Sequence, residues 1–397
     1  MRNSHPVNLK IPSFFFTVSS IKRGTMDKSK YSFDKYKDDS LRAIDARFEA
    51  QKIAFAPMTF QAIRAMIELG ILNLIEDSGD DGITIADLAK KTSLTEYGVG
   101  VLCEMALGMN VVRLSQNSTC QKDERYVLGK TGWFLLNDTL TKVNFNFTND
   151  ICYKGAFKLK ESVINGKPEG LKEFSDKWTV IYEGLSQLDE RSKKSWFEFD
   201  HFYSDIAFPV ALPVVFGSKA PKTLVDIGGN TAKWSIACCR YNSDVKVTIV
   251  DLPGQTAVAE KNAAAAGFAD RISTCSGNVL DDRTKLPSGA DAYWMSQFLD
   301  CFSLHQITKI LKKVYEAATP ETNVYVLEPL WDKQHFEASS YSLMATSLYF
   351  TCIANGNSKM YRYEELVNAI SEAGFELKTA HHNLGSNAYS LLVFRKK

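Results

Sequence analysis

The chain has 397 residues, 45% of them hydrophobic, and a formal net charge of +1 at neutral pH. This length is sufficient for two domains and a large core. The nearly neutral charge does not favour binding to nucleic acid or to a membrane surface, and no apolar run is long enough to cross a bilayer. The eight cysteines show no Cys-x-x-Cys spacing, which indicates reduced thiols in a cytoplasmic protein and no metal site.

The first part of the chain is predicted to be an extension followed by a winged helix. Residues 1–30 are unlike the rest and are expected to be disordered. Within 31–128, one helix is expected over 40–75, because apolar residues recur there at helical spacing. Two short helices at 85–91 and 95–108 then lead to a hairpin, 111–114 with 126–128.

A winged helix usually binds DNA, but the composition of this one favours another role. Its second helix, 95–108, has no Lys or Arg, and a recognition helix needs such side chains for phosphates and base edges. We therefore expect a dimerisation scaffold. The apolar stretch Ile71–Ile75 is expected to form the contact of a homodimer, because exposed apolar area of this kind marks an interface.

The segment 129–215 is predicted to be a helical connector rich in aromatic residues. Most of these side chains are expected in the core. A planar acceptor, however, needs an apolar slot with a few polar anchors. The densest candidate for such a slot is the stretch from Ser195 to Ser204, which also contains His201.

The last segment, 216–397, alternates strands and helices, which is typical of an α/β fold. We expect a mostly parallel sheet of seven strands. They lie at 223–227, 245–250, 272–276, 291–299, 323–328, 375–379 and 389–394.

Polar residues follow the first three of these strands, where a doubly wound sheet has its ligand crevice. Gly228 and Gly229 tolerate positive φ and let a ligand approach the backbone, beside Asp226 at the strand end. The three-glycine fingerprint for NAD is missing. Asp251 is placed to accept the hydroxyls of a ribose, and Asn278 is placed to reach an adenine edge.

These motifs, Asp226-Ile-Gly-Gly-Asn230, Val250-Asp-Leu-Pro253, Gly277-Asn278 and Ala373-Gly-Phe375, resemble the small-molecule O-methyltransferases that use S-adenosylmethionine. Members of that family join a winged-helix dimerisation domain to a Rossmann-like class I methyltransferase domain. The resemblance implies a homodimer, an aromatic small-molecule acceptor walled by the connector, and S-adenosylmethionine as cofactor. The cofactor contacts that it implies are Asp226, Gly228, Gly229, Asp251, Leu252, Asn278, Val279 and Ser296.

The resemblance is weakest at the catalytic base. The family has a His-Asp pair after the fourth strand, whereas this chain has Phe298-Leu-Asp-Cys301, with Leu299 at the expected His position. A phenol titrates near pH 10 and gains from a base. Asp300 is expected to be a weak one, with a pKa near 4. Glu328 matches an acid that flanks the family's His.

The catalytic candidates are therefore Glu328, Asp300 and His201, with His305 and His335 as further alternatives. Three outcomes stay open. The protein methylates a phenolic oxygen with a substitute base, or it methylates a ring carbon of a phenol, or it binds the cofactor as a non-catalytic scaffold or regulator.

Overall fold

The computed structural model describes residues 36–397, except 38, 117, 119–122 and 218. The predicted extension at 1–30 lies outside these residues. The predicted domain limits at 128 and 215 stay predictions.

The N-terminal part has the elements of the predicted winged helix. They are α1 (Ala43–Glu68), α2 (Ile71–Asp77), α3 (Ile85–Thr92), α4 (Glu96–Gly108), β1 (Val112–Leu114) and β2 (Tyr126–Leu128), and β1 pairs with β2 antiparallel. Thr84 and Thr95 cap α3 and α4, because each hydroxyl accepts a backbone N–H of the first turn. The single helix predicted over 40–75 is instead broken at Gly70, which adopts a left-handed φ of 72°.

The apolar stretch after this break does not form an exposed contact surface, so the argument for an interface at Ile71–Ile75 is wrong. Ile71, Leu72 and Ile75 are fully buried among the apolar side chains of this region's own core. Several exposed apolar side chains lie on α1 instead. They include Ile44, Ile53 and Met58, which are 66%, 77% and 72% exposed.

The connector contains helices separated by short turns. The α-helices are α5 (Lys130–Asn137), α6 (Thr139–Phe147), α7 (Leu159–Asn165), α8 (Glu190–Asp205) and α9 (Phe208–Phe216). A π-helical turn follows α6 at Thr148–Cys152, and single 3₁₀ turns cover Gly155–Lys158, Glu169–Glu173, Ile181–Glu183 and Leu185–Gln187. Aromatic packing joins these pieces: the Phe147 and Phe199 rings stack with centroids 3.9 Å apart.

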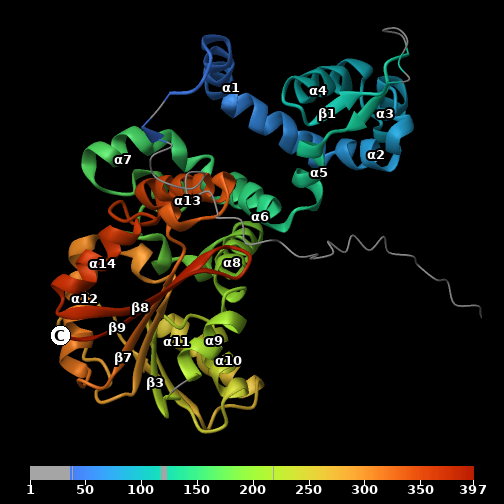
Figure 1. Ribbon diagram of the computed structural model, residues 1–397. Helices are drawn as coiled ribbons and strands as arrows, with labels where there is room; N and C mark the ends of the chain where they lie inside the picture. The colour runs from blue at the N-terminus through green and yellow to red at the C-terminus, as the bar shows by residue number, and fades with distance from the viewer. Residues whose placement is uncertain (1–35, 38, 117, 119–122, 218) are drawn as a thin grey trace, which may run out of the picture. The chain divides into compact units, whose positions relative to one another are not determined.

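The C-terminal part is a sheet of seven strands in the order β5-β4-β3-β6-β7-β9-β8 (Figure 1). The strands are β3 (Thr223–Ile227), β4 (Lys246–Asp251), β5 (Ile272–Ser276), β6 (Ala292–Ser296), β7 (Asn323–Glu328), β8 (Phe375–Leu384) and β9 (Tyr389–Lys396). Strands β5, β4, β3, β6 and β7 are parallel, and β9 is antiparallel to both of its neighbours. The predicted seven-stranded, mostly parallel sheet is confirmed.

Helices cover both faces of the sheet. On one face lie α9, α10 (Lys233–Tyr241) and α11 (Pro253–Ala265), and on the other α12 (Leu304–Ala317) and α14 (Tyr363–Glu372) (Figure 1). Helix α13 (Glu337–Tyr349) continues into a π turn, Phe350–Ala354. Strands β4 and β5 extend the sheet on one side of β3, and β6 and β7 extend it on the other side. The strand order therefore switches at β3, and the crevice for a ligand lies at the carboxyl ends there.

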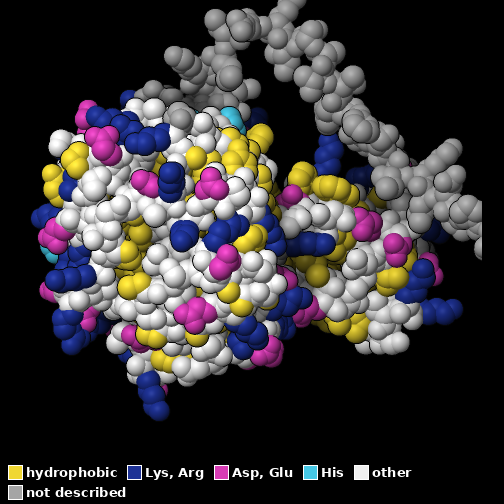
Figure 2. All heavy atoms as spheres, turned by 90° about the horizontal axis from the view of Figure 1, so that it is seen from below, with side chains coloured by type: hydrophobic (Ala, Val, Ile, Leu, Met, Phe, Trp, Pro, Cys, Tyr) yellow, Lys and Arg dark blue, Asp and Glu magenta, His cyan; other side chains and the backbone are white. Residues whose placement is uncertain are grey.

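The mixture of charges on the surface agrees with the nearly neutral net charge of the chain. On the face in Figure 2, Lys and Arg side chains are interspersed with Asp and Glu side chains. Among the described residues, no single helix is long and apolar enough to cross a membrane. The bent pair of α1 and α2, which meet at 64°, passes that test of length and composition only when the two are taken together.

Candidate functional site

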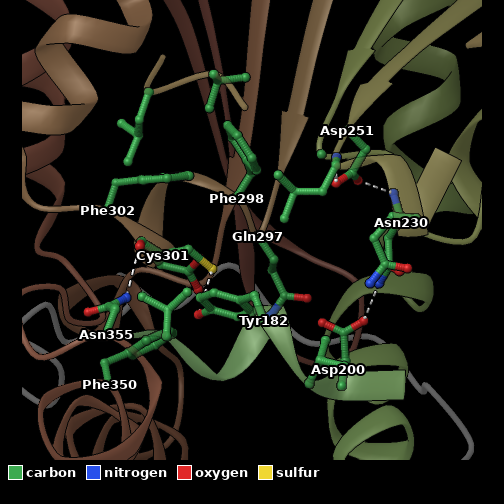
Figure 3. A pocket seen from close by; sticks show the side chains of 18 of the residues that line it. Tyr182, Asp200, Asn230, Asp251, Gln297, Phe298, Cys301, Phe302, Phe350 and Asn355 are labelled. Carbon is green, nitrogen blue, oxygen red and sulfur yellow. Dashed lines mark hydrogen bonds between the residues drawn. The ribbon is translucent and has the colours of Figure 1, made fainter. Parts of the chain in front are cut away.

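A cavity of about 330 Å³ lies beyond the carboxyl ends of the parallel strands. One part of its wall comes from the end of β4 and the loops after β3, β5 and β6, and includes Gly228, Asp251, Asn278 and Asp300. The other part is aromatic and comes from the connector, the end of α13 and the π turn after it: Tyr182, Trp196, Phe199, Tyr349 and Phe350. Tyr182 and Phe350 are labelled in Figure 3. One continuous space therefore joins the predicted cofactor residues to an apolar, aromatic chamber.

The loop after β3 requires its two glycines. Gly228 has a φ of 78°, and a Cβ there would collide with the Phe298 ring. A Cβ on Gly229 would lie 2.9 Å from Asp226 Oδ2. The glycines therefore let the loop pass close both to Phe298, which follows β6, and to its own strand, and they bring its backbone to the cavity wall.

Asp251, the last residue of β4, is held in a fixed orientation. Its Oδ2 accepts the backbone N–H of Asn230 at 2.9 Å, and its Oδ1 accepts that of Leu252 at 2.7 Å. Burial raises the pKa of this carboxyl group, while the two N–H donors lower it. Each oxygen keeps a lone pair for another donor, so Asp251 fits a pair of ribose hydroxyls. Leu252, Asn278 and Val279 line the same cavity.

A smaller cavity of about 70 Å³ adjoins the larger one, and Asp200, Gly228, Asn230 and Gln297 line both. It also contains three other predicted cofactor residues, Asp226, Gly229 and Ser296. Asp226 is buried behind the glycine loop, where its Oδ2 accepts the Ser235 hydroxyl at 2.6 Å, and burial raises its pKa to about 7. Two stacked indoles, Trp234 and Trp294, close the small cavity, with ring centroids 3.7 Å apart.

Polar atoms around the small cavity fit the aminocarboxylate end of S-adenosylmethionine. Among the described residues, Asn230 Oδ1, Ser296 Oγ and Gln297 Oε1 are buried without a hydrogen-bond partner, and so are both indole N–H groups. Buried acceptors of this kind normally have a donor. An ammonium supplies such donors, and a carboxylate would accept the indole N–H groups. The residues present therefore fit this cofactor from its ribose to its amino-acid end.

The turn after β6 places Asp300, and not Leu299, in the larger cavity. The turn is a single 3₁₀ turn, Leu299–Cys301. Leu299 is fully buried in the core that contains α12, while Asp300 lines the cavity. Glu328, the last residue of β7, fixes the turn, because its Oε1 accepts the backbone N–H groups of Phe298 at 3.1 Å and Leu299 at 2.9 Å.

The environment of Asp300 makes it a stronger base than the sequence indicated. Asp300 is only 5% exposed, and burial raises its pKa to about 7. Burial and then the neighbouring Asp300 raise the pKa of Glu328 well above its usual value. Burial and the neighbouring acid therefore disfavour ionisation of both carboxyl groups together. The expectation that Asp300 stays near pKa 4 is therefore wrong, because it neglected desolvation.

The histidine candidates lie away from this turn. His201 lines the smaller cavity only, where it stacks on Phe197, with its Nδ1 3.9 Å from Asp200 Oδ2. His305 and His335 are exposed and line neither cavity. The geometry thus gives no support to a histidine as the base in the aromatic chamber.

Several polar residues of the cavity were not singled out from the sequence. They are Tyr182, Asp200, Asn230, Gln297 and Asn355 (Figure 3). Asn230 and Gln297 directly follow predicted cofactor residues, and Asp200 lies in the aromatic stretch 195–204. Their positions in the sequence could therefore have indicated that they line the site. Asn355 directly follows the π turn Phe350–Ala354, far along the chain, and its side-chain amide donates to the Cys301 carbonyl at 2.9 Å. Only the fold brings it to the site.

Comparisons with known proteins agree with this geometry. The Dimerisation2-like domain matches residues 47–120, and the O-methyltransferase domain matches residues 158–376. The chain is 23% identical over 335 residues to L-tyrosine C(3)-methyltransferase of Streptomyces lavendulae, which covers 82% of this chain and 86% of that protein.

Two solved structures share the fold. The S-adenosylmethionine-dependent methyltransferase SibL is 21% identical, with a TM-score of 0.65 over 87% of this chain and 98% of its own. The neocarzinostatin enzyme NcsB1, solved with S-adenosylmethionine and 2-hydroxy-5-methyl naphthoic acid, is 19% identical, with a TM-score of 0.61 over 85% and 96%. Since the O-methyltransferase domain spans more than half of this chain, the protein belongs to the O-methyltransferase family and is an S-adenosylmethionine-dependent methyltransferase.

Proposed function

We propose that this enzyme methylates a small phenol in the aromatic chamber, and that Asp300, with Glu328 behind it, accepts the phenolic proton. The observation that carries the proposal is the continuity of the larger cavity. Its wall runs from Asp251, which is assigned to the cofactor ribose, past the turn with Asp300, to the aromatic side chains of the connector. This arrangement favours an enzyme over a scaffold, because a scaffold needs no such path between cofactor and acceptor.

The residues of the chamber have distinct tasks. S-adenosylmethionine supplies an electrophilic methyl group, so the protein's main task is alignment. The rings of Trp196, Phe199 and Tyr349 would hold a planar acceptor between them. Asp300 would take the proton from its hydroxyl, and the resulting phenolate attacks far more readily than the phenol.

A phenolate is nucleophilic at oxygen and at the adjacent ring carbons, so two products are chemically accessible. The similarity to a tyrosine C(3)-methyltransferase over most of the chain makes ring methylation a candidate beside O-methylation. Attack by carbon must be followed by loss of the ring proton, whereas attack by oxygen gives the ether directly. The orientation of the ring against Asp300 decides between them.

The test is incubation of the protein with methyl-labelled S-adenosylmethionine and a panel of small phenols, followed by mass spectrometry. We expect a labelled product whose fragments locate the methyl group on oxygen or on a ring carbon. Asp300→Asn should remove most of the turnover while S-adenosylhomocysteine still binds. If the wild-type protein binds phenols and cofactor together but forms no labelled product, the proposal fails.

We also propose that the protein is a homodimer, joined through its N-terminal region. Support comes from the match to a Dimerisation2-like domain and from the exposed apolar side chains of α1.

A further inference from the structure

Most polar side chains in the aromatic part of the larger cavity donate their protons within the protein. The Tyr182 hydroxyl donates to Cys301 Sγ at 3.2 Å, and both residues are labelled in Figure 3. The Asn355 side-chain amide donates to the Cys301 carbonyl at 2.9 Å. The Trp196 indole N–H donates to the Tyr349 hydroxyl at 3.0 Å. Each of these three donors therefore has its acceptor without a ligand.

The Tyr349 hydroxyl differs, because it keeps a proton for which the described part of the chain provides no acceptor. An indole N–H can only donate, so the bond from Trp196 engages a lone pair of the Tyr349 oxygen and leaves the O–H of Tyr349 unused. The Tyr349 ring packs against the rings of Phe147 and Phe350, which offer no acceptor atom. Burial raises the pKa of Tyr349 well above its usual value, so the hydroxyl stays protonated at neutral pH.

Tyr349 is placed where only the contents of the larger cavity can use this proton. Tyr349 and its partner Trp196 both line that cavity, and each is less than a tenth exposed, at 6% and 7%. The bond from Trp196 also limits the directions in which the O–H can point, since it takes one of the lone pairs of the oxygen. The hydroxyl is thus oriented before a ligand arrives.

A planar acceptor that fills the chamber removes water from the Tyr349 hydroxyl. A buried O–H without an acceptor is unfavourable, whereas an oxygen atom on the bound molecule would remove that cost. A carbonyl oxygen suits the chamber better than a carboxylate. A carboxylate would meet the acid Asp300, and the described residues that line this cavity include no Lys, Arg or His.

We infer that Tyr349 determines substrate specificity: its O–H donates to a carbonyl oxygen that the phenolic acceptor carries, as in a hydroxyaryl ketone. Trp196 is then a positioning residue, because it orients the hydroxyl. The inference rests on the proposed function and specifies its substrate class, since the phenol goes to Asp300 and the carbonyl group to Tyr349.

Matched pairs of ligands test this inference. The ortho, meta and para isomers of hydroxyacetophenone are each compared with the ethylphenol of the same substitution, which has a methylene in place of the carbonyl group. Calorimetric titration into the protein saturated with S-adenosylhomocysteine measures binding without turnover. We expect at least one ketone to bind about tenfold or more tightly than its ethylphenol, because the ethylphenol leaves the Tyr349 hydroxyl unpaired. Ratios near one for every pair, or no binding by any of these phenols, overturn the inference.

Tyr349→Phe is the matched variant, because it removes the O–H and keeps the ring. The ratio of ketone to ethylphenol affinity should fall toward one. Tyr325→Phe is the control and should keep the wild-type ratio. Tyr325 is also buried and its hydroxyl also accepts a side-chain N–H, that of Asn323 at 3.2 Å, but it lines neither cavity. An unchanged ratio in Tyr349→Phe means that another group binds the carbonyl oxygen, and the inference is then wrong.

A second measurement uses the wild-type protein, because Tyr349→Phe leaves the Trp196 N–H without its acceptor and could unfold. The infrared C=O stretch of an isotope-labelled ketone shifts to lower frequency when an O–H donates to the carbonyl oxygen. We expect this shift in the bound ketone, and a frequency equal to that in an apolar solvent overturns the inference. Labelled methyl transfer is measured separately: ketones that bind with the expected ratio but are not methylated refute the proposed function and leave the role of Tyr349 in binding intact.

Discussion

Glu328 Oε1 accepts the backbone N–H of Leu299 at 2.9 Å, and this bond joins the end of β7 to the turn after β6. Because the bond engages the backbone, the Leu299 side chain is free to pack into the core while the next residue, Asp300, faces the cavity. The carboxyl group that orients the turn thus lies beside the carboxyl group that the turn presents.

Leu299→His should not create a base. The imidazole would enter the core around α12 without a partner, and we expect a loss of about 2–4 kcal/mol in the free energy of unfolding and no gain in methyl transfer. Leu299→Met conserves volume and is the control, with a loss below about 1.5 kcal/mol. Denaturant titration measures both. Faster methylation by the His variant would mean that position 299 faces the acceptor after all.

Asp300→Asn should lower kcat by about 10²- to 10⁴-fold, the range that a general base contributes. The side chain keeps its size, so calorimetric binding of S-adenosylhomocysteine should stay within twofold. Asp282→Asn, an exposed carboxylate that pairs with Lys309, is the matched control and should keep full activity. Full activity in Asp300→Asn would show that another group is the general base.

The pH dependence should identify the same group. Since burial raises the pKa of Asp300 to about 7, kcat should rise with pH through about 7 and level off above it. A carboxyl group at its ordinary pKa would give a rise near 4 instead. A rate that is flat between pH 5 and pH 8 would contradict the assignment.

The stability of the protein should show the opposite trend over that range. Asp300 loses its proton near pH 4 in the unfolded chain but only near pH 7 when folded, so the unfolded state binds fewer protons between these values. Its contribution to the free energy of unfolding therefore falls as pH rises from 4 to 7. Asp300→Asn lacks this contribution, and its unfolding curves should depend less steeply on pH than those of the wild type. An unchanged slope would show that Asp300 is not the titrating group.

Asp251→Ala should weaken binding of S-adenosylhomocysteine about 100-fold. Two hydrogen bonds from the ribose hydroxyls to the charged carboxylate would be lost, and each contributes about 1.5 kcal/mol to binding. Asp244→Ala is the control, because Asp244 is exposed and precedes the opposite end of β4. Calorimetry measures the affinity of both variants for S-adenosylhomocysteine. Equal affinities would contradict the assignment of Asp251 to the ribose hydroxyls.

The dimer prediction concerns α1. Ile53→Asp combined with Met58→Asp should convert a dimer into a monomer in light scattering, because two carboxylates would enter the apolar contact. Ile164→Asp changes a comparably exposed apolar residue on α7 and should leave the dimer intact. A wild-type protein that is already monomeric would refute the proposal itself.

The sequence predicted the sheet and the crevice well, because periodicity and strand-end polar residues are local signals. It wrongly predicted an exposed apolar surface at Ile71–Ile75, since an apolar run looks the same whether a partner or the chain's own core covers it. It did not reveal that Leu299 is buried while Asp300 lines the cavity, because a one-residue shift in a short turn exchanges a buried side chain for a cavity-lining one. It also missed Asn355 and the raised pKa of Asp300, which depend on burial and on contacts between distant segments.

The stacked pair Trp234 and Trp294 gives the protein a built-in optical signal. The two indole planes are 10° apart and buried, and both rings line the small cavity that fits the amino-acid end of the cofactor. A charged ligand arriving there changes the field around both chromophores and supplies partners for their N–H groups. Ultraviolet emission from the unlabelled protein should therefore follow cofactor exchange in real time, over the emission of the other four tryptophans, Trp133, Trp178, Trp196 and Trp331.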